Sequence, residues 1–91
     1  MKVAPLHSAS AVSDYDLCKL LIEHGANVNA IRHGGYTALH AAAQNGKTEL
    51  AQLLLSHGAD KNILTDKGES AVMLAKVKSH NDTADFIETY N

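Results

Sequence analysis

Residues 34–46 read GGYTALHAAAQNG, and a shorter version of this string, APLHSA, stands at residues 4–9. The two strings share a register in which residues 4–30 align with residues 37–63, an offset of 33 positions, without a gap. Ten of the 27 aligned positions are identical, including the Leu-His pair of each string. A second step of 33 positions is weaker but keeps the same register. A fixed period of this length indicates a tandem array of one structural unit.

Each unit is expected to contain two helices. The first, at roughly residues 38–45, is rich in alanine, whose small side chain lets neighbouring helices approach closely, and Gly46 ends it. The second, at roughly residues 48–56, carries leucines at helical spacing. Thr48 is a candidate N-cap of this second helix, and Gly58 is expected to stop it.

A turn-rich connection joins consecutive units. It reads ANVNAIRHGGY over residues 26–36 and ADKNILTDKGE over residues 59–69. Gly35 and Gly68 occupy the same place in the two copies, where a hairpin-like turn needs a positive φ angle. The repeating unit is therefore a turn, a helix, a turn and a helix.

The strings GGYTALHAAAQNG and LAQLLLSHGADKN resemble the ankyrin repeat, in which Thr-Pro-Leu-His and paired alanines precede a leucine-rich helix and a Gly-Ala-Asp/Asn-x-Asn ending. Ala38 replaces the proline in this chain. The resemblance implies an all-α solenoid of stacked helix-turn-helix repeats with hairpin-like connecting loops. It implies a single domain, residues 1–91, of about two and two-thirds repeats: repeat 1 at about 1–34, truncated at its start, repeat 2 at about 35–67, and repeat 3 at about 68–91, a C-terminal cap.

Charge and composition narrow the classes of function. The formal net charge is −2, and the eight Lys and Arg residues are scattered, so nothing favours binding to nucleic acid or to an anionic membrane. No run approaches the roughly 18 apolar residues of a transmembrane helix. The single cysteine, Cys18, excludes an intramolecular disulfide and suits a reducing compartment. We therefore expect a cytoplasmic protein.

Six histidines raise the question of catalysis or metal binding. His7 and His40 occupy the same place in consecutive units, and this recurrence favours a structural role over that of a base or a metal ligand. A zinc site needs about four converging ligands in short paired spacings, and the chain has neither a CxxC pair nor an HExxH motif. It also lacks the GxSxG elbow of a serine nucleophile. We expect no enzyme, no cofactor and no metal.

The resemblance assigns structural roles to the recurring residues. It implies that His40 hydrogen-bonds the Thr37 hydroxyl and neighbouring backbone, so that adjacent loops are tied together. His7 has the same implied role, although Ala4 offers it no hydroxyl. The structural motif positions are Thr37, His7, His40, Gly25, Gly58, Gly35 and Gly68.

The positions that vary between repeats fall at the hairpin tips and at the ends of the short inner helices. By resemblance to ankyrin arrays, these positions line one concave face, where such modules bind protein partners. The predicted partner-binding residues are Ile31, Arg32, His33, Tyr36, Gln44, Asn45, Leu64, Asp66, Lys67, Glu69, Val77 and Lys78. We expect Tyr36 to be exposed with Arg32 nearby, a composition favoured at interface hot spots. Ile31 and Leu64 have the alternative of packing beneath their own hairpins.

Two interpretations of function follow from these residues. The preferred one is a non-catalytic protein–protein interaction module, because the predicted face mixes both signs of charge whereas a nucleic-acid site favours one sign. The alternative is a regulatory or targeting ankyrin segment of a larger enzyme or scaffold protein.

The two ends of the array are expected to differ. In repeat 3 the polar residues Asp82, Thr83, Asp85 and Glu88 suggest an outer face on which nothing stacks. In repeat 1, little room is left for a wholly polar N-terminal face by the apolar residues Leu6, Val12, Leu17, Leu20, Leu21 and Ile22. This apolar end predicts either further repeats before this segment or self-association with another copy.

Overall fold

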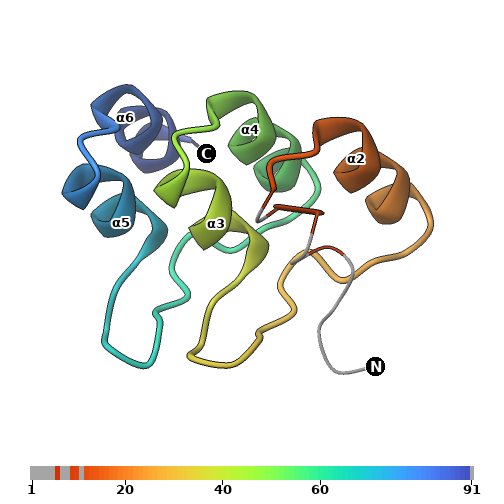
Figure 1. Cartoon of the computed structure of the whole chain (residues 1–91), viewed down its shortest axis with the longest axis horizontal. Helices are drawn as coiled ribbons and strands as arrows, with labels where there is room; N and C mark the ends of the chain where they lie inside the picture. The colour runs from red at the N-terminus through yellow and green to blue at the C-terminus, as the bar shows by residue number, and fades with distance from the viewer. Residues whose placement is uncertain (1–5, 7–8, 11, 91) are drawn as a thin grey trace.

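The computed structural model describes residues 6, 9–10 and 12–90 of the chain. The helices whose bounds lie within the described residues are α2 (Tyr15–Glu23), α3 (Ala38–Gln44), α4 (Thr48–Ser56), α5 (Ala71–Val77) and α6 (Asn81–Thr89). Figure 1 shows α2, α4 and α6 side by side in one row, with α3 and α5 in a second row. The long connecting loops extend together from one side of the two rows (Figure 1). This arrangement confirms the predicted all-α stack of helix-turn-helix units.

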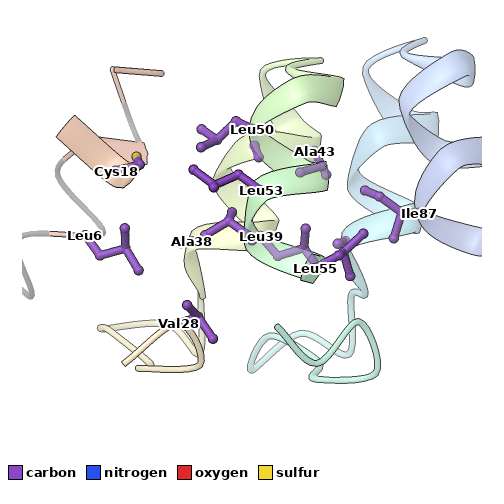
Figure 2. Close-up of a cluster of buried hydrophobic side chains, with 14 of the residues drawn as sticks. Leu6, Cys18, Val28, Ala38, Leu39, Ala43, Leu50, Leu53, Leu55 and Ile87 are labelled. Carbon is purple, nitrogen blue, oxygen red and sulfur yellow. The ribbon is translucent and has the colours of Figure 1, made fainter. Parts of the chain in front are cut away.

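The core lies between the two rows of helices. Ala42 and Ala43 of α3 are completely buried, and their small side chains let α3 approach the outer helices closely. On α4, Leu50 and Leu53 point toward Cys18 of α2 (Figure 2). Their relative exposures are 2% and 6%. Burying a leucine side chain stabilises the fold by roughly 1.5–3 kcal/mol, so each repeat depends on its neighbour for much of its stability.

Short polar side chains start three of the helices. The Thr37 hydroxyl accepts a hydrogen bond from the backbone N–H of His40 at the start of α3, and Ser70 does the same for Met73 in α5. Asp14 caps α2 by accepting from the backbone N–H of Leu17 at 3.1 Å. These caps satisfy backbone donors that the first helical turn leaves without partners.

The prediction that Thr48 caps α4 is wrong. The N-cap residue is Lys47, which makes no side-chain capping bond, and Thr48 is the first helical residue. The Thr48 hydroxyl instead lies 2.7 Å from the hydroxyl of Thr83 in α6. Thr83 is buried, so it faces α4 and does not belong to the polar outer face on which we placed it. The other three polar positions of that prediction, Asp82, Asp85 and Glu88, are exposed.

A lysine from repeat 2 caps the last helix of repeat 3. The Lys61 ammonium group donates to the carbonyl oxygens of Ile87, Glu88 and Tyr90 at 3.2, 3.0 and 2.7 Å. These carbonyl groups lie at the C-terminal end of α6, where a cation also interacts favourably with the helix dipole. The Lys61 side chain of repeat 2 is therefore hydrogen-bonded to the backbone of repeat 3.

The turns that precede α2, α4 and α6 share a left-handed residue at the same position. Their central residues, Ser13, Gly46 and Ser79, have φ angles of 59°, 68° and 64°. Such angles are unfavourable for a residue with a Cβ atom. At Gly46 a Cβ atom would also lie 2.5 Å from Nδ1 of His80. The middle repeat therefore requires glycine here, whereas the outer repeats tolerate serine.

We predict opposite effects of substituting Gly46 and Ser79. Gly46→Ala should lower the free energy of unfolding by about 1–3 kcal/mol, because it adds backbone strain and a clash with His80. Ser79→Gly is the control in the same register, and it should raise this free energy by up to about 1 kcal/mol by relieving the positive-φ strain alone. Urea denaturation of the three proteins measures both values. Shifts in the same direction would contradict the explanation.

Candidate functional site

The ring of His40 links two consecutive repeats. It is almost fully buried, with 1% relative exposure. Its Nδ1 accepts a hydrogen bond from the backbone N–H of Thr37 at 3.0 Å, and the Thr37 hydroxyl lies 2.9 Å from the same nitrogen. Its Nε2 donates to the backbone carbonyl oxygen of Glu69 in the next hairpin at 3.1 Å. One imidazole therefore fixes the start of α3 and the position of the following loop.

These contacts require the neutral form of His40. A backbone N–H can only donate, so Nδ1 must carry a lone pair, and a carbonyl oxygen can only accept, so Nε2 carries the proton. Burial lowers the pKa of His40 below its ordinary value of 6.5, although hydrogen bonds with the Glu69 and Ile63 backbone act in the opposite direction. Both nitrogens are occupied within the scaffold, which leaves neither available as a catalytic base. His7, assigned the same role by resemblance, lies outside the described residues.

Further hydrogen bonds connect the hairpin loops. The backbone N–H of Asp66 donates to the carbonyl oxygen of Gly34 at 2.9 Å. The Asn29 side chain donates to the carbonyl oxygen of Gly58 at 3.0 Å and accepts from the backbone N–H of Asp60 at 2.7 Å. A Cβ atom on Gly35 would lie 2.8 Å from the backbone nitrogen of Asp66, so only glycine permits this approach of the two loops. The loops are therefore held at a fixed spacing.

The four motif glycines have the backbone conformation expected of them. The φ angles of Gly25, Gly35, Gly58 and Gly68 are 91°, 82°, 94° and 79°. Gly25 and Gly58 directly follow the C-cap residues of α2 and α4.

The predicted partner-binding residues lie on the hairpin loops and at the C-terminal ends of α3 and α5, and we call this set the candidate surface. Nine of them are exposed: Ile31, Arg32, His33, Asn45, Leu64, Asp66, Lys67, Val77 and Lys78. Tyr36, Gln44 and Glu69 are half-buried. The Glu69 carboxylate accepts a hydrogen bond from the Thr65 hydroxyl at 3.2 Å, so this acid is partly used within its own hairpin.

Tyr36 differs from our expectation of an exposed side chain. Its ring meets the His40 ring edge-on, with 5.8 Å between the centroids. The Arg32 guanidinium carbon also lies 5.8 Å from the centroid of the Tyr36 ring, and an isolated β-bridge pairs the two residues. Tyr36 therefore shields His40 and supports the hairpin. The sequence could not show this, because the contact depends on how the hairpin folds back over α3.

Aliphatic side chains of the candidate surface are exposed. Ile31 and Leu64 are 60% and 54% exposed, so they do not pack beneath their hairpins. Val77 at the end of α5 is 74% exposed. A rigid scaffold that presents apolar side chains to solvent is typical of a binding surface.

Sequence reasoning missed Met73 as an exposed residue. Met73 occupies the register position of His40, and its thioether sulfur accepts a hydrogen bond from the Ser70 backbone N–H at 3.4 Å. Its relative exposure is 49%. No sequence signal separates it from a core residue, because a methionine at helical spacing is usually buried.

Cys18 is not arranged as a nucleophile. The thiol is fully buried, and its sulfur lies 3.6 Å from the Ser10 hydroxyl oxygen. Burial raises the pKa of the thiol, which favours the unreactive protonated form. Within the described residues, no group of three or more His, Cys, Asp or Glu side chains is arranged to hold a metal ion.

A comparison of the sequence with protein-family models agrees with the fold described above. The sequence matches the family model described as ankyrin repeats (3 copies) over residues 6–88. The chain belongs to the ankyrin repeat family. Ankyrin repeats generally act as protein–protein interaction modules and are typically non-catalytic. No curated protein matches the chain at a significant level.

The helices of this ankyrin array are short. The longest in the described part of the chain have nine residues, and none there is long and apolar enough to cross a membrane.

We predict that His40 makes the stability of the ankyrin array depend on pH. The unfolded chain takes up a proton at His40 near pH 6.5, whereas the folded chain resists protonation until a lower pH. This contribution to stability is therefore fully present above about pH 6.5 and is lost as the pH falls toward the folded pKa, with a slope of at most about 1.4 kcal/mol per pH unit.

The measurement is urea denaturation between about pH 8 and pH 5. His40→Gln is the comparison, because it keeps a polar side chain but does not titrate. It should unfold about 1–3 kcal/mol more easily at pH 8, since buried partners lose their hydrogen bonds, and its stability should vary less with pH. Equal pH slopes for the two proteins would show that His40 is not the titrating group.

Proposed function

We propose that this chain is a non-catalytic interaction module that binds a protein partner through the concave face formed by its hairpin tips and inner helices. One observation carries the proposal: Ile31 and Leu64 hold the same place in consecutive repeats, and both expose more than half of their side chains on a rigid hairpin. Nothing in the fold of the repeat requires an aliphatic residue at a solvated loop position. A protein partner that covers these side chains supplies the reason.

The charges of the candidate surface favour a protein partner over a nucleic acid. The basic side chains are Arg32, Lys67 and Lys78, and the acidic ones are Asp66 and Glu69. A polyanion is bound by a surface of one sign, whereas a mixed surface beside apolar side chains suits a protein. A reducing compartment such as the cytoplasm fits the single free thiol of Cys18.

An alternative is that these repeats form the regulatory or targeting segment of a larger enzyme or scaffold protein. The same surface then recruits a substrate or anchors the larger protein. The two proposals differ in whether a catalytic or scaffold domain adjoins the repeats in the gene.

We predict that the double variant Ile31→Asp with Leu64→Asp loses binding to peptides selected from a random display library on the native chain. Charged groups at both positions should weaken binding at least tenfold, a change of about 1.4 kcal/mol, because they remove the apolar contact. Both positions are exposed, so stability should change by less than about 0.5 kcal/mol per site.

The matched control is Gln52→Asp with Asn81→Asp. It adds the same charge at exposed sites on the outer helices α4 and α6. The control should bind the selected peptides as the native chain does. Undiminished binding to the Ile31 and Leu64 variant would reject the candidate surface. Tyr36→Ala is a poorer test, because loss of the contact with His40 would also destabilise the fold.

Self-association through α2 is a second candidate function. Leu17 and Leu20 are 41% and 50% exposed, whereas their counterparts in α4, Leu50 and Leu53, are 2% and 6% exposed. Leu50 and Leu53 of α4 are buried beside α2, whereas Leu17 and Leu20 of α2 stay exposed. A second copy of the chain that packs on α2 would bury these two side chains.

We predict that the native chain forms a weak dimer, with a dissociation constant on the order of 100 µM or weaker, because two half-exposed leucines supply only a small apolar area. Sedimentation equilibrium at increasing concentration measures it. Leu20→Lys should abolish the dimer, whereas Leu64→Lys, which changes a leucine of similar exposure on a hairpin, should preserve it. A strictly monomeric native chain at millimolar concentration would reject self-association.

A further inference from the structure

One sulfur atom of this chain is open to solvent at the start of a helix. The chain has three sulfur-bearing residues, Met1, Cys18 and Met73, and the structure describes the last two. Cys18 is fully buried, and burial raises the pKa of its thiol, which disfavours the reactive thiolate. Met73 on α5 is 49% exposed, and Figure 1 shows α5 at the end of its row, beside α3. An oxidant in solution therefore reaches the sulfur of Met73 but not that of Cys18.

The sulfur of Met73 belongs to the N-terminal cap of α5. The Ser70 backbone N–H donates to Sδ at 3.4 Å, and the Met73 backbone N–H donates to the Ser70 hydroxyl at 3.2 Å. Together the two bonds form a capping box. In the usual capping box the acceptor three residues after the cap is a side-chain oxygen of Glu or Gln. A thioether sulfur is a weak acceptor, so the Ser70 N–H has a poor partner.

The equivalent cap in repeat 2 has a stronger acceptor. There the Thr37 backbone N–H donates to Nδ1 of His40 at 3.0 Å. The two caps have similar backbone angles, with φ and ψ of −109° and 173° at Thr37 and of −88° and 167° at Ser70. The start of α5 is therefore shaped for a polar acceptor, and the exposure of Met73 leaves room for an added oxygen atom.

Oxidation of Met73 by a peroxide would supply such an acceptor. A sulfur lone pair attacks one oxygen of hydrogen peroxide, the S–O bond forms and the O–O bond breaks. The released hydroxide takes up the proton of the transferred oxygen and leaves as water. The sulfur is thereby oxidised to a sulfoxide and the peroxide is reduced. Because Sδ corresponds to Cδ of glutamine, the sulfoxide oxygen corresponds to Oε1, the acceptor of an ordinary capping box.

We propose that Met73 is a reversible oxidation site, at which a peroxide changes the exposed surface of α5 from apolar to polar while the helix cap is kept. Val77 lies one helical turn after Met73 on the same face and is 74% exposed. The sulfoxide therefore places a polar group beside this valine of the candidate surface. Methionine sulfoxide reductases restore the thioether, with a dithiol as the electron donor and water as the product.

The first experiment treats the folded full chain with hydrogen peroxide and locates the added oxygen by mass spectrometry of its peptides. Met73 should be oxidised nearly as fast as in a short peptide of the sequence of α5, whereas Cys18 should stay reduced until urea unfolds the chain. Incubation with the reductases and dithiothreitol should remove the oxygen from Met73. A Met73 that is oxidised only in urea, or a sulfoxide that the reductases leave in place, would overturn the oxidation site.

The second experiment tests whether the cap is kept. Met73→Gln carries an oxygen where the sulfoxide has one, and Met73→Leu has no acceptor. The urea midpoints of the oxidised chain and of Met73→Gln should equal or exceed that of the native chain, and Met73→Leu should lie below both, since its Ser70 N–H loses a partner. The Ser70 amide proton resonance should shift downfield on oxidation, as a stronger hydrogen bond forms.

Peroxide-treated Met73→Leu is the matched control, because any effect of oxidising Met1 appears there as well. Its urea midpoint and its Ser70 resonance should not change on treatment. An oxidised native chain with a urea midpoint below that of the untreated chain would overturn the retained cap, as would an unshifted Ser70 resonance.

Discussion

The buried imidazole of His40 is the contact on which the rest of this structure depends. A hydrogen bond to Thr37 fixes where α3 begins, and a hydrogen bond to Glu69 fixes where the next hairpin lies. Because both bonds use one rigid ring, the helix and the loop of adjacent repeats cannot move independently. Tyr36 covers the ring from the side of the hairpin. The position of the second hairpin relative to α3 follows from this junction.

The architecture could be predicted from sequence because its signals are local and repeated. Alanine runs, a leucine stripe and terminating glycines placed α3 and α4 within about one residue of their observed bounds. The apolar N-terminal face was predicted only in part. Val12, Leu17 and Leu20 are exposed there, whereas Leu6 and Ile22 of the predicted set are buried in the core.

Contacts between distant side chains could not be predicted in the same way. Thr48 looked like a helix cap because threonine suits that role, yet its hydroxyl meets Thr83 instead. Lys61 caps α6 from 26 to 29 positions away, and no spacing rule marks a lysine for that task. The candidate surface was inferred from positions that vary between repeats. Such variation indicates which positions are free to change but does not predict how far each side chain is exposed to solvent. Tyr36 shows the difference, since it varies between repeats and yet is half-buried.

The hydrogen bonds that join the repeats connect residues about one repeat length apart in sequence. His40 and Glu69 are 29 positions apart, and the most distant pair described here, Thr48 and Thr83, is separated by 35 positions. The entropy needed to close a loop therefore stays nearly constant as the array grows. Proteins with mainly local contacts fold quickly, and repeat arrays can nucleate at one unit and propagate. Folding should therefore begin in repeat 2, which has a neighbour on each side, and spread outward at a rate that depends little on the number of repeats.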